Sequence, residues 1–481
     1  MNALTNNKKI FFSISSIIII ISFVCSVFTS IYFLSKYDKY QKDNLTHIML
    51  KEETFYHWWS AAKIVNQVKN GENFFTAGEE VLTKPLPQRL VAIYSWITDF
   101  NILSDDSKNL KVNLGGKLAF LITQSLIYYL SLFYFYKIIK DFFPEKNCFY
   151  IIAFLALEPN LFFFHSSFWT ESFYFSLQLL VLSLIIKKNN SRIIFILIGI
   201  LLGFLFLQRS AAIFYIFIIV FYYIFLLKKK SVIPIIYMLI PYILIISFLG
   251  FHNYKRAGVF YIMPTEGKYA IHRYFSNDVL SKALKIDPIL SEKLESELTY
   301  KWLKENKIKL DHALDYKKIN TSLAYRFYIK DEKERMKFYN YLNFRGYQIL
   351  LEHPIETIKS VIKGYIHFSV LDPKFVYYDF EYYKDYKLKD IVYSDIHKKW
   401  IPIRIVYSII IYSIVCIGIY DLFINQKKKK LLLIIILSVA YYYFLLGWYG
   451  KTRLFVPILI YFSILFGNGL VFILDKTYKK N

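Results

Sequence analysis

The chain has 481 residues, of which 56% are hydrophobic and 20% aromatic, and its formal net charge is +24. So large an apolar fraction excludes an ordinary soluble protein, because roughly half of the chain would have to be hidden from water. Nucleic-acid binding is also excluded as the reason for the charge, because the lysines form short blocks next to apolar stretches, as is typical of membrane-helix ends.

The apolar stretches predict an all-α polytopic membrane protein with about ten transmembrane helices. No small-residue cleavage site follows the first stretch, so we expect a retained anchor rather than a cleaved signal. The third and fourth stretches are short and closely joined, which favours a kinked or partly re-entrant pair. The predicted spans are 10–35, 116–139, 147–165, 169–186, 193–208, 211–227, 232–251, 401–424, 431–449 and 454–475.

The lysine-rich segments predict the orientation, because Lys and Arg concentrate in cytoplasmic loops. With both termini in the cytoplasm, every block of several lysines lies inside, including those in the short segments 187–192, 228–231 and 425–430; segment 140–146 lies inside as well. We expect a bacterial inner or plasma membrane. The predicted organisation is an N-terminal membrane module 1–251 with seven spans and an outer loop 36–115, an outer helical domain 252–400, and a C-terminal membrane module 401–481 with three spans.

Both outer loops are expected to be helical. In the first loop, apolar residues recur at helical spacing from Trp58 to Val68, and Leu90–Phe100 is a second apolar-rich stretch. Such helices suit the membrane interface, with aromatic side chains at headgroup depth. In the large loop, 288–364 is charged and helix-favouring, and Pro354 predicts the start of a further helix.

An acidic pair, Glu52-Glu53, follows the first predicted membrane helix in the outer loop. A carboxylate can remove the proton from an acceptor as the anomeric carbon of a sugar donor is attacked. Such a pair at the membrane face is therefore a candidate catalytic group. The alternative is two solvated charges beside Lys51.

The surroundings of this pair resemble the first outer loop of lipid-dependent membrane glycosyltransferases of the C-type fold, such as protein O-mannosyltransferases and lipid A aminoarabinose transferases. The resemblance covers spans one to seven and the ends of the large loop. Glu52 stands where that family usually has Asp, Leu454 where Tyr is common, and many members have more spans. The matching residues are Glu52-Glu53-Thr54-Phe55-Tyr56, Ala61-Ala62, Asn70-Gly71, Lys84-Pro85-Leu86, Pro159, Trp169-Thr170-Glu171, Gly203, Arg209, Asn253-Tyr254, Gly258, Arg453 and Pro457.

The resemblance implies an inverting glycosyltransferase that uses Glu52 or Glu53 as the catalytic base at the outer membrane face. The donor would be a polyprenyl phosphate that carries a hexose or a pentose, and the acceptor a lipid, a glycan or a protein. Tyr56 would contribute to substrate binding.

Cations on the outer face are the second set of candidates, because a departing phosphate needs nearby positive charge. The guanidinium of Arg fits two phosphate oxygens, whereas Lys acts as a point charge. The alternative for each cation is snorkelling to lipid headgroups. Glu171 lies at the outer end of a span and would either pair with Arg209 or contact the substrate. The predicted substrate- and phosphate-binding residues are Lys84, Arg209, Arg256, Arg453, Tyr56 and Glu171.

No metal or other cofactor is indicated. His165 and His252 lie at outer span ends without ligand spacing, so we expect an interfacial role for them rather than a metal site. No Asp-x-Asp motif lies on the inner face and no P-loop or dinucleotide fingerprint occurs, which favours a lipid-linked donor over a nucleotide sugar.

Two other classes remain open. An O-antigen-type polymerase or ligase has a similar number of spans and a large outer loop with arginines, but the acidic pair in the first loop does not fit that class. A non-enzymatic transporter of lipid-linked glycans would show broken helices in two matching halves, and the sequence has no such symmetry.

Overall fold

The computed structural model is helical, and none of the residues it describes belongs to a strand. The long apolar runs explain this, because a helix satisfies its backbone hydrogen bonds within one segment, as a lipid environment requires. The structure describes residues 14–32, 53–74, 77, 85–98, 114–166, 171–187, 191–263, 271–309, 329, 331–371, 395–425, 428–449 and 452–478.

Six helical segments are long and apolar enough to cross a membrane, and one bent helix pair would make a seventh if it counts as one span. The predicted all-α membrane class is therefore confirmed. The number of ten spans stays a prediction, because α7 (Glu171–Ile186) and α8 (Arg192–Gln208) have only 16 and 17 residues. The six segments are Ile14–Tyr32, Leu118–Ile139, Ser210–Lys255, Ile401–Ile424, Lys429–Tyr449 and Val456–Thr477.

The segment Ser210–Lys255 is interrupted near its middle. It contains α9 (Tyr215–Leu227) and α10 (Val232–Ala257), which are joined by a 3₁₀ turn, η2 (Lys228–Ser231). Lys228 has a φ of 50°, a left-handed conformation that ends the regular helix at this point.

α8 and α10 lie side by side and point the same way. A Cβ added at Gly199 would lie 2.1 Å from the carbonyl oxygen of Met238, and one at Gly203 would lie 2.7 Å from Cδ1 of Ile245. The residue numbers rise together along both helices. α9, which connects them in the chain, therefore runs in the opposite direction, and the chain passes along the bundle three times between the start of α8 and the end of α10.

A bend of 50° separates α5 (Glu145–Leu157) from α6 (Pro159–Ser166). Pro159 has no N–H for a helical hydrogen bond, and a proline disfavours the helical conformation in the residue before it. Glu158 is accordingly extended, with φ −60° and ψ 125°. The kink that we expected between the third and fourth predicted spans thus lies inside the third.

α20 (Val456–Tyr478) is the most buried of the candidate spans, with 78% of its apolar stretch inside the protein. It packs against α5 and against α18 (Asp395–Ile424). The contact with α18 is made by glycine: a Cβ at Gly469 would lie 2.0 Å from the carbonyl oxygen of Ile414. The main hydrophobic core of the protein is built around this helix.

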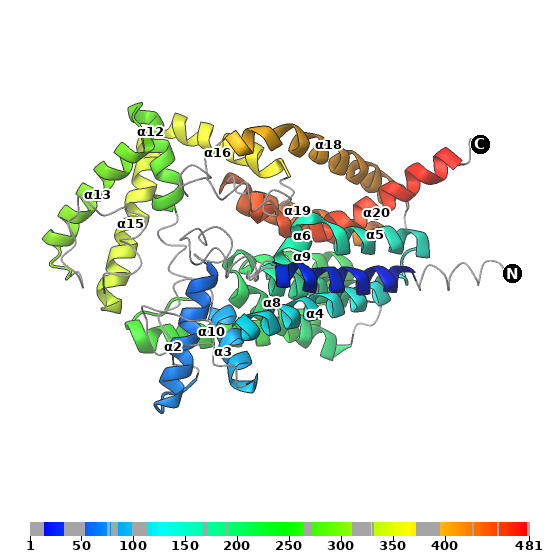
Figure 1. The fold of residues 1–481 in the computed structure, drawn as a ribbon, viewed down its shortest axis with the longest axis horizontal. Helices are drawn as coiled ribbons and strands as arrows, with labels where there is room; N and C mark the ends of the chain where they lie inside the picture. Colours follow the sequence, from blue (N-terminus) through cyan, green and yellow to red (C-terminus); the bar gives the residue numbers. More distant parts are fainter. Residues whose placement is uncertain are drawn as a thin grey trace.

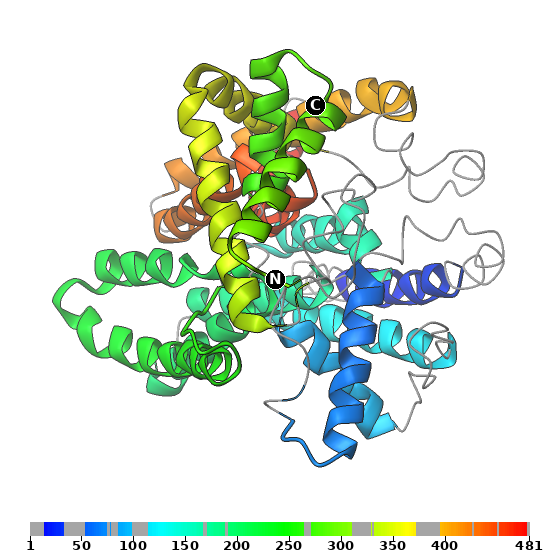
Figure 2. The same ribbon diagram turned by 90° about the vertical axis from the view of Figure 1, so that its left-hand side faces the viewer.

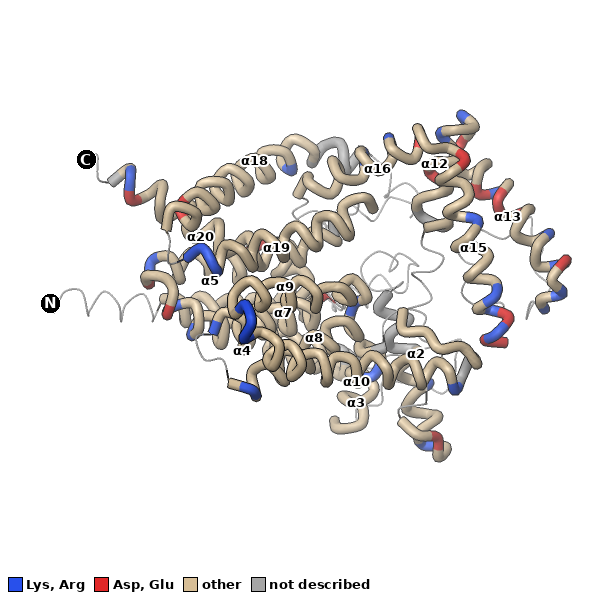
Figure 3. The backbone as a smooth tube through the Cα atoms, turned by 180° about the vertical axis from the view of Figure 1, so that it is seen from behind, with Lys and Arg blue, Asp and Glu red and all other residues tan. Residues whose placement is uncertain are grey.

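The two ends of the helical bundle differ. Both chain termini lie at one end, here called the terminal end, and the helices of the large loop lie at the other, the loop end (Figure 1). At the terminal end, the Lys146 ammonium lies 2.6 Å from a carboxylate oxygen of Asp475, and the Lys428 ammonium lies 4.7 Å from the ring centre of Phe143. Two of the segments predicted to face the cytoplasm are therefore neighbours. Figure 3 shows charged residues concentrated toward the two ends of the molecule.

The large loop forms helices at the loop end, and their starts follow from the sequence. Asp287 caps α13 by accepting a hydrogen bond from the Ile289 N–H, and Asp331 caps α15 by accepting one from the Glu334 N–H. α13 and α15 lie side by side across this end of the molecule (Figure 2, green and yellow). The α-helices that the structure describes in this loop are α12 (Asn277–Leu284), α13 (Pro288–Glu305), α15 (Glu332–Glu352) and α16 (Pro354–Ser369).

Candidate active site

The predicted catalytic pair lies at the start of α2 (Glu53–Lys69), the first helix of the first outer loop. Glu53 is the first residue of this helix, where the helix dipole favours a carboxylate, and Tyr56 lies in its first turn. The side chains of both residues, and the whole of Glu52 and Lys84, lie outside the described part of the structure. The catalytic and binding roles of these four residues therefore stay predictions.

α2 packs against α3 (Pro85–Thr98), the second helix of the first loop. Ala61 and Ile64 of α2 are buried together with Val91 and Ala92 of α3. The small side chains let the two helices approach closely, so the apolar spacing seen in the sequence forms their contact. The helices occur where the sequence predicts them, and their place in the membrane interface stays a prediction.

An aromatic chain connects this helix pair to the bundle. The ring of Tyr94 on α3 lies 5.3 Å from that of Phe120 on α4 (Leu114–Ile139), measured between ring centres. Phe120 in turn lies 5.8 Å from Phe173 on α7. Phe173 is two residues from Glu171, the first residue of α7. The first outer loop is therefore anchored at the first turn of α7, the turn that begins with Glu171.

Glu171 and Arg209 form a buried ion pair. An Nη of Arg209 donates a hydrogen bond of 2.9 Å to a carboxylate oxygen of Glu171, and the two side chains are 7% and 0% exposed. The guanidinium also lies over the ring of Tyr174, 5.7 Å from its centre. The sequence analysis left two alternatives for Glu171, a pair with Arg209 or a direct contact with the substrate. The structure contains the pair.

Local conformation puts both charges where they meet. Glu171 begins α7, and the amino end of a helix favours a negative charge. Arg209 follows the last residue of α8 in an extended conformation, with φ −150° and ψ 125°, before the 3₁₀ turn η1 (Ser210–Ala212). A buried charge next to lipid is costly unless it is paired, so the two residues stabilise each other. A guanidinium has five N–H donors, and the bond to Glu171 leaves it the capacity to bind an anion.

A network of tyrosines lies deeper in the bundle, next to Tyr174. The hydroxyl oxygens of Tyr174 and Tyr442 are 2.7 Å apart, and Tyr215 bonds both Ser438, at 2.8 Å, and Tyr461. These residues come from α7, α9, α19 (Lys429–Leu446) and α20. The network fixes four helices relative to one another beneath Arg209. The sequence analysis missed it, because only the high tyrosine content signalled it.

Arg256 and Arg453 belong to segments at the loop end, but their side chains lie outside the described residues. Arg256 is in the last turn of α10, which ends at Gly258 in the left-handed conformation, with φ 67°. Arg453 is in the 3₁₀ turn η8 (Thr452–Phe455), which packs against α16 and α19. Convergence of these arginines with Arg209 on one phosphate therefore stays a prediction.

The interfacial role expected for His165 is wrong, because this residue is fully buried in the bundle. Its ring stacks on that of Tyr128, with 3.4 Å between the ring centres, and its Nδ1 lies 2.8 Å from the hydroxyl of Ser172. His252 is also buried, at 6% exposure. The prediction failed because both residues lie at span ends in the sequence, whereas the packing of neighbouring helices covers them.

Glu158, at the bend between α5 and α6, is a buried carboxylate that the sequence analysis did not select. It accepts hydrogen bonds from the Tyr407 hydroxyl at 2.9 Å, the Asn160 amide at 2.8 Å and the Leu161 N–H at 2.8 Å. These bonds connect the bend to α18. A lone acidic residue within an apolar stretch could have revealed it.

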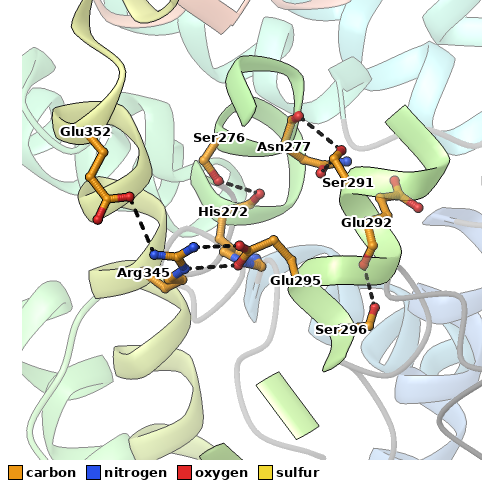
Figure 4. Close-up of polar contacts among 9 residues, drawn as sticks. All are labelled: His272, Ser276, Asn277, Ser291, Glu292, Glu295, Ser296, Arg345 and Glu352. Carbon is orange, nitrogen blue, oxygen red and sulfur yellow. Dashed lines mark hydrogen bonds and ion pairs between the residues drawn. The ribbon is translucent and has the colours of Figure 1, made fainter. Parts of the chain in front are cut away.

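A second buried cluster of charges lies in the large loop, away from the bundle (Figure 4). Arg345 of α15 donates two hydrogen bonds, of 2.7 and 3.1 Å, to the two oxygens of Glu295 on α13. His272 lies 3.2 Å from the same carboxylate. Burial raises the pKa of Glu295, but the hydrogen bonds and charges of His272 and Arg345 outweigh it and lower this pKa overall. The cluster joins α13 to α15 and to the segment around His272.

Among the described residues, no group of three or more His, Cys, Asp or Glu could hold a metal ion.

No protein-family model matches the chain, and no curated protein is similar to it in sequence. Among solved structures, it is similar to an oligosaccharyltransferase of Archaeoglobus fulgidus in the apo form and to the archaeal oligosaccharyltransferase AglB of the same organism in complex with an inhibitory peptide and a dolichol-phosphate. Each match has 12% sequence identity and a TM-score of 0.47, and covers 96% of this chain and 51% of the other. The chain thus spans about half the length of these proteins.

Proposed function

We propose that this chain is an integral-membrane glycosyltransferase that moves a hexosyl or pentosyl group from a polyprenyl phosphate to an acceptor. The observation that carries the proposal is the buried Glu171–Arg209 pair, which lies where the helices of the first outer loop are anchored to the bundle. An arginine in that position has a guanidinium available next to the loop that carries the acidic pair. The sequence resemblance described above supports the same class.

The proposed reaction is a single displacement. The acceptor hydroxyl attacks the anomeric carbon, and the bond between this carbon and the phosphate oxygen breaks with inversion. Glu52 takes the proton of the hydroxyl, and the polyprenyl phosphate leaves as an anion with its charge stabilised by Arg209, assisted by Lys84, Arg256 and Arg453. Glu53 and Tyr56 orient the substrates. Glu171 holds the guanidinium of Arg209 in place.

We place this reaction on the outer side of a bacterial inner membrane, with both termini in the cytoplasm and about ten spans. Cysteine labelling in intact cells tests the orientation. A membrane-impermeant thiol reagent should modify Lys293→Cys on α13 and leave Lys429→Cys at the terminal end unmodified. The reverse pattern would overturn the orientation, because both lysines are exposed and differ in the end at which they lie.

The activity test incubates the purified protein with a panel of polyprenyl-phosphate sugars and candidate lipid, glycan and protein acceptors. Release of polyprenyl phosphate together with a glycosylated acceptor is expected, and a Glu52→Gln/Glu53→Gln double variant is the matched control. Release of polyprenyl diphosphate from diphosphate-linked glycans alone would favour the polymerase or ligase class. Movement of an intact lipid-linked glycan across vesicles without bond cleavage would favour the transporter.

A further inference from the structure

The helix α16 of the large loop carries an apolar stripe that no described residue covers. Ile355, Ile358, Ile362 and Ile366 follow each other at helical spacing, and their exposed fractions are 62%, 59%, 54% and 61%. Four exposed isoleucines on one helix face form an apolar surface of the kind that marks an interaction site. Lys359 and Lys363 lie exposed beside this stripe.

The opposite face of α16 packs against η7 (Gly447–Tyr449), the 3₁₀ turn that follows α19. A Cβ at Gly364 would lie 2.1 Å from the carbonyl oxygen of Trp448, so backbone meets backbone there. One turn further, the ring of Phe368 lies 5.7 Å from that of Tyr443, measured between ring centres. The residue numbers rise along α16 while they fall along α19. α16 therefore advances along this candidate span, from its loop end toward the interior of the bundle.

The end of α16 lies well inside the thickness defined by the candidate spans. Tyr412 of α18 donates a hydrogen bond of 2.8 Å to the carbonyl of Ser369, and Ser408 accepts one of 2.9 Å from the N–H of Leu371. Tyr412 lies eleven residues from Ile401, where the apolar segment of α18 begins. Ser408 lies seven residues from Ile401. At 1.5 Å per residue the two positions are about 10 and about 16 Å along α18, between about a third and about half of a hydrocarbon core of about 30 Å.

At the carboxyl end of α16, protein groups take the place of water as hydrogen-bond partners of the backbone. The last carbonyls of a helix have no partner within the helix, and water usually satisfies them at a protein surface. Here hydroxyl groups are partners instead: Tyr412 of α18 donates to the Ser369 carbonyl, and the Ser369 hydroxyl donates to the Tyr365 carbonyl at 2.8 Å. Irregular backbone at membrane depth is tolerated where protein groups satisfy it in this way.

We propose that α16 is a half-membrane helix, with its isoleucine stripe in the acyl chains of the loop-side leaflet and with Lys359 and Lys363 reaching the lipid phosphates. Two observations identify lipid as the occupant. The end of α16 is hydrogen-bonded to α18, a candidate span whose Ile405 and Ile409 are themselves exposed. The flanking lysines have long apolar stems that let an ammonium reach anionic headgroups from a buried helix. The chain therefore enters the membrane within the loop 252–400, which the sequence places wholly outside.

Spin labels on α16 test this proposal. Ile358→Cys, Ile362→Cys and Ile366→Cys are made singly in a full-length variant that lacks Cys25, Cys148 and Cys416, and each is labelled and reconstituted into bilayers that contain anionic phospholipid. Collisions of the label with dissolved oxygen, which enriches in lipid, are compared with collisions with a water-soluble nickel chelate. The matched control is Leu298→Cys on α13, a similarly exposed apolar position on a helix far from the bundle (Figure 1).

Oxygen collisions should exceed nickel collisions on α16, with a ratio that rises from Ile358 to Ile366, whereas the control shows the reverse. Nickel collisions at Ile362 and Ile366 as frequent as at Leu298 would overturn the proposal, because the stripe would then face water. Few collisions with both reagents would overturn it as well, because a protein segment or a partner would then cover the stripe. Three positions are labelled so that one misfolded variant, detected by size-exclusion chromatography, leaves the test decisive.

Discussion

In the part of the chain that the structure describes, two buried carboxylates are paired with an arginine, and the two pairs are built differently. In the large loop, Arg345 uses two donors on both oxygens of Glu295, and His272 lies against the same carboxylate. In the bundle, one Nη of Arg209 bonds one oxygen of Glu171 at 2.9 Å. The loop pair uses both oxygens of Glu295, and an Nη of Arg345 also lies 3.8 Å from a carboxylate oxygen of Glu352. The bundle pair leaves the guanidinium capacity for another anion.

The difference helps to distinguish an ion pair that stabilises the fold from one whose arginine can also bind a substrate. A bidentate pair assisted by a histidine stabilises the arrangement of α13 and α15, and further ligands would have to displace a partner. A single bond next to an aromatic ring orients a guanidinium without saturating it. We therefore expect substitutions in the loop pair to change stability, and substitutions at Arg209 to change transfer.

The largest expected effect is on transfer, from loss of the predicted base. Glu52→Gln should lower turnover by a factor of about 10² to 10⁴, because the acceptor proton then has no general base. Glu53→Gln should be milder if that residue orients the acceptor. The measurement is the initial rate of polyprenyl phosphate release per folded protein. The control is Glu295→Gln, a buried carboxylate outside the proposed site, which should leave this rate unchanged. Near wild-type activity in Glu52→Gln would make Glu53 the first candidate.

Arg209 should have the next largest effect. Arg209→Lys keeps a positive charge opposite Glu171 but loses the two-pronged fit to phosphate, so transfer should fall nearly as far as in Arg209→Ala, by about 10² to 10³. Arg453→Lys and Arg453→Ala should behave in the same way. Donor affinity and turnover are measured for all four variants, and Arg345→Lys is the control in the loop pair. If lysine is tolerated at both positions, Arg209 only pairs with Glu171 and Arg453 only snorkels, and Lys84 and Arg256 become the candidates for the phosphate site.

Arg345 should affect stability rather than turnover. Arg345→Ala leaves Glu295, which is 3% exposed, without its main partner, and the expected loss is about 3 kcal/mol of unfolding free energy. The measurement is thermal unfolding in detergent. A double variant, Arg345→Met/Glu295→Leu, should recover much of the loss, because it removes the buried charge together with its partner. An unchanged midpoint in Arg345→Ala would contradict the supporting role of the pair.

The smallest expected effect is the pH dependence of the same loop pair. The pKa of Glu295 is lowered in the folded state from its ordinary value of 4.5, so the carboxylate stabilises the fold above 4.5 and this stabilisation is lost as the pH falls through the lowered pKa. The midpoint temperature of thermal unfolding of the wild-type protein should therefore fall more steeply below pH 4.5 than that of Glu295→Gln. Parallel curves for the two proteins would show that the ion pair does not contribute to stability.

The sequence was sufficient for the fold class and for most helices, because long apolar runs and capping residues such as Asp331 act locally. It was insufficient where a property depends on partners far along the chain. The bond between Tyr174 and Tyr442 joins residues 268 positions apart, and no local pattern indicates it. The burial of His165 likewise depends on helices that meet only in the fold.

The candidate site divides in the same way. The pairing of Glu171 with Arg209 could be expected, because a lone acidic residue at a span end needs a cation and Arg209 lies in the short turn after the span 193–208. The proposed embedding of α16 in the membrane could not be expected from the sequence, because Glu356, Lys359 and Lys363 lower the hydropathy of this helix below that of a membrane segment. Its isoleucines become meaningful only once Gly364 and Ser369 are seen against the bundle.

The close contact between α8 and α10 also has a mechanical consequence. A Cβ at Gly199 would lie 2.1 Å from Met238 carbonyl oxygen and 2.8 Å from Cγ of Pro241, so the two helices cannot slide past each other without losing this fit. They act as one rigid unit, in which Arg209 follows the end of α8 and Arg256 lies in the last turn of α10. Any opening of the loop end to admit a bulky lipid-linked substrate would then carry both arginines together. The distance between the backbones of Arg209 and Arg256 therefore stays constant. The motion needed for substrate entry has to come from the elements around α8 and α10.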